Sequence, residues 1–140
     1  MTQLETLFSK YNFPKRDNST VTTIKEIESI INFTLPDDFI FFASNYQGFE
    51  DLIGQHYVRL WDIDEIISSN RNYQIFDNLP KTLGIGGNGG SEFIALEQTS
   101  NNLRVVLSPF IDLDPQYHIE IGNSFTDFLV RLDEGHEWFQ

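Results

Sequence analysis

A glycine-rich stretch of the chain has the spacing that can bind a nucleotide. Gly84, Gly86 and Gly89 fit the pattern G-x-G-x-x-G, which in dinucleotide-binding folds ends a strand, begins a helix and places a pyrophosphate at the N-terminus of that helix. Here the chain continues into Phe93–Leu96, an aromatic and β-branched run without helical spacing. Glu92 also places a carboxylate where the phosphate would lie. The sequence therefore predicts a glycine-rich turn between two strands, with no nucleotide cofactor.

The turn contains more glycine than one tight connection needs. Four of the five residues from 86 to 90 are glycine, and each glycine costs roughly 0.5–1 kcal/mol relative to alanine within a regular element. Two explanations remain open: the glycines supply backbone geometry alone, or they allow the close approach of another backbone, from a neighbouring element or from a partner. The turn is therefore a candidate partner-binding segment, with the residues Gly86, Gly87, Asn88, Gly89, Gly90 and Glu92.

Two further groups of residues are candidates for partner binding. One group, at residues 61–65, precedes and begins a predicted helix, where acidic side chains also stabilise the positive end of the helix dipole. The other group is the pair Asp112 and Asp114, whose side chains point the same way if the chain is extended. These aspartates are open to three interpretations: solvated turn acids, acceptors for a partner's lysine or arginine, or ligands of a hard cation. We predict no metal site, because the glycine and further acids of a calcium-binding loop are missing. The two groups are Trp61, Asp62, Asp64 and Glu65, and Asp112 and Asp114.

The sequence offers no recognisable catalytic set. There is no cysteine, and Ser91 does not lie in a G-x-S-x-G motif. His118 is predicted to lie on the polar face of a strand, exposed to solvent or to a partner. His56 lies in a predicted loop and His136 near the C-terminal end. We therefore predict no catalytic residue.

Apolar periodicity predicts an α+β fold. Helices are expected over residues 3–11, from a Thr23–Glu26 capping box, from Pro36 to Gly48, over residues 62–67 and from Phe125 to Gly135. Strands are expected at residues 57–61, 83–85, 93–96, 104–107 and 117–121. This order predicts a twisted, mainly antiparallel sheet with N- and C-terminal helices packed on it, all helices lying on one face.

Length and charge limit the class of protein. The 140 residues suit a single domain, with an N-terminal helix and loop over residues 1–21 and a core over residues 22–133. No signal peptide or membrane-length apolar run is recognised, so we expect a soluble cytoplasmic protein. The net charge of −12 argues against direct nucleic-acid binding. It fits a basic protein partner, although acidity can also serve solubility alone.

Four short motifs, in order along the chain, resemble those of the SUKH superfamily, also called the Smi/Knr family. Leu35–Phe39 resembles the start of a family helix, Leu60–Ile66 a strand followed by a short acidic helix, Gly86–Glu97 the glycine turn with its following strand, and Ser124–Leu129 the closing helix. The resemblance covers residues 22–133.

This resemblance implies a non-enzymatic protein-interaction domain. Bacterial members are mostly immunity proteins that bind a cognate polymorphic toxin, often a nuclease, and fungal members are linked to cell-wall glucan synthesis. We predict an immunity protein, monomeric or weakly dimeric, that binds a basic nuclease toxin through the sheet face, the glycine turn and neighbouring acids. A regulatory or scaffold protein of the Smi/Knr type is the alternative, and an enzyme of unknown type is a third hypothesis.

Overall fold

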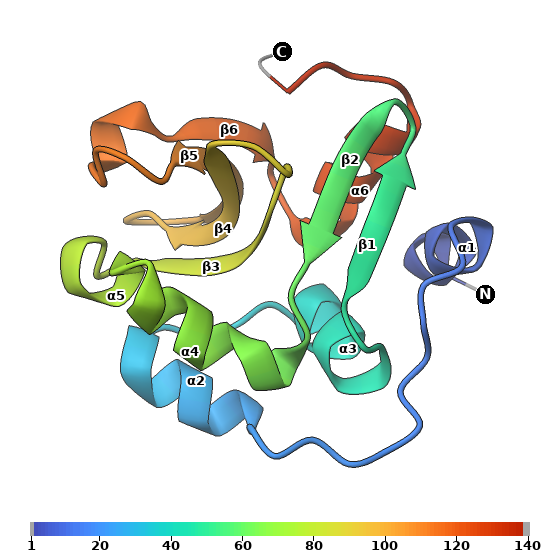
Figure 1. Cartoon of the computed structure of the whole chain (residues 1–140), viewed down its shortest axis with the longest axis horizontal. Coiled ribbons are helices and arrows are strands. Elements are labelled where there is room, and N and C mark those ends of the chain that lie inside the picture. The colour runs from blue at the N-terminus through green and yellow to red at the C-terminus, as the bar shows by residue number, and fades with distance from the viewer. Residues whose placement is uncertain (1, 139–140) are drawn as a thin grey trace.

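Within residues 2–138, the part of the chain that the computed structural model describes, six strands form one antiparallel sheet. Each strand pairs with its neighbour in sequence, in the order β1-β2-β3-β4-β5-β6, and the sheet is strongly curled (Figure 1). The predicted antiparallel sheet is thus confirmed, and β1 is an edge strand that the sequence analysis did not anticipate. The strands are β1 Phe49–Ile53, β2 His56–Leu60, β3 Thr82–Gly87, β4 Glu92–Gln98, β5 Leu103–Pro109 and β6 Ile119–Gly122.

Six α-helices surround the sheet in this described part of the chain, and most of their ends carry local sequence signals. Thr2 and Glu5 form a complete capping box at the first helix. At Thr23 only half of the predicted capping box forms. The Thr23 side chain accepts from the Glu26 amide, but no hydrogen bond from the Thr23 amide to the Glu26 side chain is present. The third helix ends before the predicted stop at Gly48. The helices are α1 Gln3–Lys10, α2 Ile24–Ile31, α3 Asp37–Asn45, α4 Ile63–Asn72, α5 Ile75–Asn78 and α6 Phe125–Asp133.

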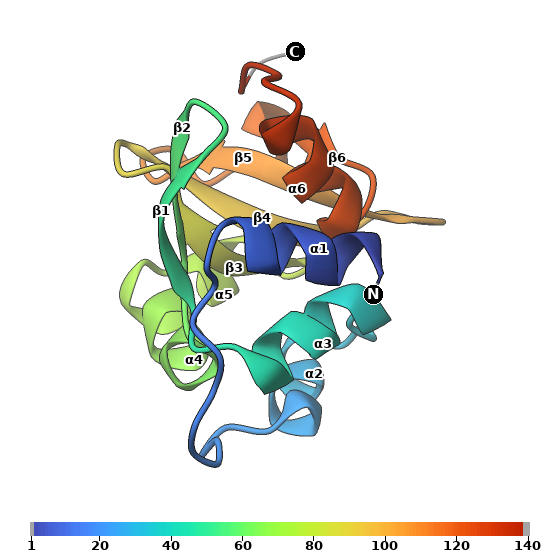
Figure 2. The ribbon, with the colours of Figure 1, turned by 90° about the vertical axis from the view of Figure 1, so that its right-hand side faces the viewer.

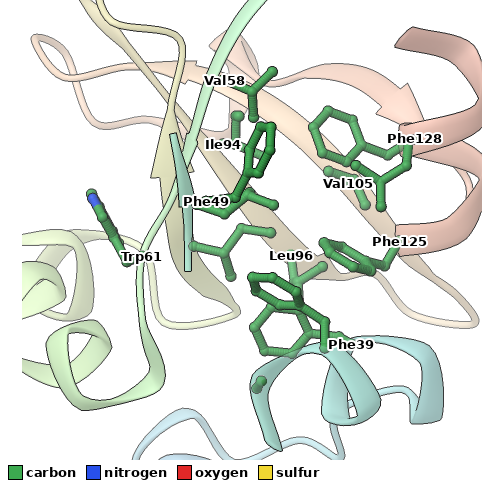
Figure 3. Packing of buried hydrophobic residues seen from close by; sticks show 14 of the residues in the cluster. Phe39, Phe49, Val58, Trp61, Ile94, Leu96, Val105, Phe125 and Phe128 are labelled. Atoms are coloured by element: carbon green, nitrogen blue, oxygen red, sulfur yellow. The ribbon is translucent and has the colours of Figure 1, made fainter. Parts of the chain in front are cut away.

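The main core lies between the inner face of the sheet and helices α3 and α6. Phe39 of α3 packs edge-on against Phe125 of α6, with ring centroids 5.4 Å apart. Figure 3 shows these rings and Phe128 turned toward Leu96 and Val105 of the sheet. All five side chains are fully buried, and burial of each is worth about 1.5–3 kcal/mol. This core fixes the curvature and orientation of the strands.

A second, smaller apolar cluster lies on the opposite face of the sheet. Phe93, Ala95 and Val106 point away from the main core and contact Ile75 and Leu79, which lie in and just after α5. Alternate residues of a strand point to opposite faces, so β4 serves both clusters. Figure 2 shows α4 and α5 on the other side of the strands from α6. The expectation that helices pack on one face is therefore wrong, because α5 covers the outer face as well.

The strand predicted at residues 117–121 forms only in part. Tyr117 ends a 3-10 helix over Pro115–Tyr117, and the pairing of β5 with β6 shifts register between Val105 and Val106. This irregularity breaks the strict alternation. His118 is consequently buried, and its Nδ1 lies 2.5 Å from a carboxylate oxygen of Glu97. The prediction that His118 faces solvent or a partner is wrong, because the side chain joins a buried pair instead.

Candidate partner-binding surface

The glycine motif is a hairpin turn between β3 and β4, as predicted. Gly89 adopts a left-handed backbone conformation with a φ of +82°. The side chain of Asn88 fixes the turn from both directions: its Nδ2 donates to Glu92 at 3.0 Å, and its Oδ1 accepts from the Gly90 amide at 3.1 Å. A strand, not a helix, follows the turn. The segment therefore has no helix N-terminus for a phosphate.

Two of the glycines are required by the close approach of β2. A Cβ atom at Gly86 would lie 1.9 Å from the carbonyl oxygen of Arg59, and a Cβ at Gly89 would lie 2.6 Å from the ring of Tyr57. At Gly90 the nearest atom would be 3.5 Å away, which is an ordinary contact. The neighbour that approaches so closely is thus an element of the chain itself.

A buried asparagine anchors the start of this hairpin. Asn70 of α4 has no exposed surface. Its Nδ2 donates to the carbonyl oxygens of Ile66 at 2.8 Å and Gly84 at 2.9 Å, and its Oδ1 accepts from the Gly84 amide at 2.7 Å. β2 pairs with β3 only at Gly86 and Gly87, so the side chain satisfies the backbone groups of Gly84 that β2 leaves open. Asn70 was not among the predicted site residues.

Three of the predicted site residues have structural roles at the start of α4. Trp61 is only 6% exposed, and its ring stacks on Tyr73 with centroids 6.1 Å apart. Asp62 caps α4 and forms an ion pair with the largely buried Arg16. Asp64 accepts from the amides of Thr22 at 2.8 Å and of Val21. These backbone hydrogen bonds lower the pKa of the Asp64 carboxyl. The two aspartates hold the loop before α2 against α4.

The outer face of the β1–β2 hairpin remains exposed next to the glycine turn. On this face Leu52, which is 53% exposed, lies opposite Tyr57, and Glu50 lies opposite Arg59. The Tyr57 hydroxyl donates to the Glu50 carboxylate, and this hydrogen bond raises the pKa of Tyr57. Arg59 Nη2 lies 3.7 Å from a carboxylate oxygen of Glu65. We call these five residues the outer surface; the glycine turn borders it, since Arg59 pairs with Gly87.

The outer surface contains a recess of about 270 Å³. Glu50 of β1 and Glu65 of α4 line it together with Arg59 of β2, which lies opposite Glu50 and contacts Glu65. Phe49 and Pro14 supply apolar contacts in its wall. The two carboxylates outnumber the single arginine, so the charged side chains that line the recess sum to a negative charge. Together with the apolar wall, this charge suits the long stem and charged head of a lysine or arginine.

The loop after β5 adjoins the glycine turn, since the Phe110 amide donates to the Ser91 carbonyl oxygen at 2.9 Å. Beyond it, Ile111 is 75% exposed and Asp112 has a left-handed backbone. Asp114 caps the 3-10 helix by accepting from the Gln116 amide. Within residues 2–138, no group of three or more histidine, aspartate or glutamate side chains is arranged to hold a metal ion.

Comparison with known protein families identifies the family of this chain. The model of the SMI1/KNR4 family (SUKH-1) matches residues 19–131. The chain belongs to the SMI1/KNR4 family. A search of curated proteins found no significant match. The resemblance inferred from the four sequence motifs is therefore confirmed.

The SMI1/KNR4 match includes every strand of the sheet, the glycine turn and the outer surface. Helix α1 lies before the matched region and packs against α6, where Lys10 and Tyr11 both bond Asp133. The family is generally a non-catalytic immunity or regulatory domain, which indicates protein–protein interaction. Among the helices of residues 2–138, none combines the length and apolar character needed to cross a membrane.

Proposed function

We propose that this SMI1/KNR4-family chain is an immunity protein that binds and neutralises a cognate polymorphic toxin of the nuclease type. Family membership supports a role in protein interaction. The net charge of −12 supports a basic partner, because opposite fields accelerate encounter and suppress wrong partners. A nuclease fits this chemistry, since it must present cationic side chains to the phosphates of its substrate.

The observation that carries the proposal is the composition of the outer surface. Leu52 and Tyr57 give it an apolar centre, and the carboxylates of Glu50 and Glu65 border the recess beside them. Interfaces commonly combine apolar or aromatic anchors with a polar rim. The surface is also rigidly supported, because β1 and β2 pack on the main core through Phe49 and Val58 on their inner face.

Among the predicted candidates, Glu65 and the glycine turn lie at this surface. The carboxylates of Asp62 and Asp64 are engaged by the chain's own groups. The contact region we propose therefore centres on Glu50, Tyr57 and Glu65 and extends along the glycine turn. In this proposal the protein acts in the cytoplasm as a monomer, where it meets the toxin.

The proposal is tested by co-expression with basic nuclease toxin domains encoded in adjacent reading frames. The expected result is rescue of growth and a purified complex whose association rate falls steeply with added salt. The double variant Glu50→Lys/Glu65→Lys should lower affinity by at least about tenfold. The matched control Glu26→Lys/Asp77→Lys makes the same change in net charge at exposed helix positions away from the recess.

Two outcomes would contradict the proposal. Equal loss of affinity in both double variants would show that net charge alone, without the outer surface, drives binding. Failure to rescue cells from any adjacent toxin would remove the immunity role. A pull-down that instead returned cell-wall or signalling proteins would favour the regulatory role linked to glucan synthesis.

A further inference from the structure

We propose that β1 accepts an extended cationic segment of the partner as a seventh strand of the sheet. The inference rests on the proposed function only in taking a basic protein as the partner. β1 stands at the end of the strand order, and its middle residues Glu50, Asp51 and Leu52 are all exposed. Figure 1 shows it at the margin of the sheet, with β2 on one side and α1 with the chain after it beyond the other. Tyr11, just after α1, accepts from the Gly54 amide at the end of the strand, so the open part of the edge is residues 50–52. An exposed edge of this kind can pair with an added strand.

The turn between β1 and β2 fixes which backbone groups face outward. Gly54 and Gln55 form a two-residue connection, and Gly54 has a φ of +60°. Such a turn closes on a hydrogen-bonded pair, here Ile53 and His56, and bonded pairs then alternate with non-bonded pairs along an antiparallel ladder. Glu50 and Leu52 therefore occupy non-bonded positions. Their amide and carbonyl groups point away from β2, toward the free edge.

Asp51 covers part of this edge in the free protein. Its Oδ1 accepts from the amide of the next residue, Leu52, at 2.7 Å. A carboxylate in this position covers an outward-facing donor, repels acidic strands and disfavours apolar ones, because its burial against them would cost hydration. It thus protects the edge from unselective pairing. A lysine or arginine on an incoming strand would attract the carboxylate and uncover the amide. The edge is thus selective for a cationic segment.

A second copy of this chain is a poor occupant of the same edge. Antiparallel pairing of two β1 strands would bring Glu50 and Asp51 of one copy close to the same residues of the other. Like charges opposite each other destabilise a strand pair. Antiparallel addition of a different segment places a basic residue opposite Glu50, a second opposite Asp51 and an apolar residue opposite Leu52. The residue opposite Glu50 also points toward the recess that Glu50 lines.

The other edge of the sheet lacks these properties. β6 has four residues, and its pairing with β5 is irregular. Its acidic residue Glu120 lies within 4.0 Å of both Arg104 and Arg131. The carboxylate therefore already has two cationic neighbours within the chain. This contrast assigns the strand addition to β1.

The test uses a capped peptide of sequence TTVKKVTT and the full chain labelled with ¹⁵N. In the proposed register the first valine lies opposite Leu52 and the two lysines lie opposite Asp51 and Glu50. The amides of the first valine and second lysine then face β1, whereas those of the first lysine and second valine face away. We expect chemical-shift changes centred on β1 and slower exchange of the Glu50 and Leu52 amides.

N-methylation of the peptide separates strand pairing from charge attraction, because it removes amide donors without changing side-chain charge. Methylation of the two amides that face β1 should weaken binding by at least about tenfold, and methylation of the other two should leave it within about threefold. The peptide TTVEEVTT should bind at least about tenfold more weakly. Asp51→Asn should weaken binding of the lysine peptide, whereas the matched variant Asp77→Asn should not.

The results distinguish this inference from the proposed function. Equal effects of both methylation patterns, shift changes away from β1, or no binding of the lysine peptide would overturn strand addition at this edge. A toxin complex that formed normally under those results would leave the immunity proposal standing. Conversely, the predicted peptide results without any toxin partner would support the edge and contradict the immunity proposal.

Discussion

Replacement of Asn70 by alanine tests whether a buried side chain outside the surface supports the glycine hairpin. In the native structure this amide makes three hydrogen bonds of 2.7–2.9 Å, two of them to the backbone of Gly84. Gly84 is buried, so Asn70→Ala leaves both its amide and its carbonyl group without a partner and without access to bulk water. The hairpin loses its attachment to α4 at the same position.

The expected cost follows from these two orphaned groups. Each buried polar group left unsatisfied costs about 1–3 kcal/mol, so Asn70→Ala should lower the free energy of unfolding by about 2–6 kcal/mol. That is a large share of the roughly 5–15 kcal/mol available to a typical domain. The matched control is Asn78→Ala, because Asn78 Nδ2 also donates to the carbonyl four residues earlier, at 2.8 Å, but in an exposed position. Its cost should stay within about 0.5 kcal/mol.

Urea unfolding followed by tryptophan fluorescence and circular dichroism measures both variants, with the m-value checked for two-state behaviour. Asn70→Asp adds a second comparison: it keeps an acceptor for the Gly84 amide but turns a charged oxygen toward two carbonyls. It should be at least as destabilising as Asn70→Ala at neutral pH. If Asn70→Ala costs no more than Asn78→Ala, the role assigned to these hydrogen bonds is refuted.

Two other substitutions test packing and electrostatics. Gly86→Ala would place a methyl group 1.9 Å from a backbone oxygen of β2 and should cost more than about 2 kcal/mol in urea unfolding, whereas Gly90→Ala should change stability by less than about 0.5 kcal/mol. The hydrogen bonds from Lys10 and Tyr11 lower the pKa of Asp133, so they stabilise the fold above the unfolded aspartate pKa of about 4, and this stability is lost as pH falls through the folded value. The difference in unfolding free energy between the native protein and Asp133→Asn should therefore be greatest near neutral pH and shrink in acid.

Each of these two expectations can fail clearly. Equal stability of the Gly86→Ala and Gly90→Ala variants would mean that β2 can move away from the hairpin at little cost. A difference between the native protein and Asp133→Asn that stayed constant from neutral to acidic pH would mean that the carboxylate contributes nothing through its charge.

The elements predicted correctly from sequence are those whose signals are local. The glycine turn was recognised because Phe93–Leu96 has strand character and no helical spacing. The last helix was recognised from its apolar stripe and its serine cap, which accepts from the Asp127 amide. Such signals depend on residues a few positions apart, so they can be recognised without knowing how the rest of the chain folds.

The elements missed from sequence depend on long-range contacts. β1 has no strand pattern in the sequence, because its three middle residues are all exposed and only its end residues, Phe49 and Ile53, are buried. Apolar and polar residues therefore do not alternate along it. His118 seemed to face solvent because the irregular pairing of β6 with β5 cannot be seen in a pattern of alternating residues. Its partner Glu97 lies 21 residues away.

The sequence by itself determined the α+β class, the glycine turn, the acidity and the family of this protein, since composition and short motifs encode them. Tertiary structure alone decided which carboxylates lie at the exposed surface beside a recess. Asp62 is paired with the largely buried Arg16, which lies 46 residues earlier, whereas Glu50, bonded to the nearby Tyr57 hydroxyl, is exposed and lines the recess. The physical reason is that the exposure of a carboxylate, and the group it pairs with, depend on which residues the folded chain brings beside it.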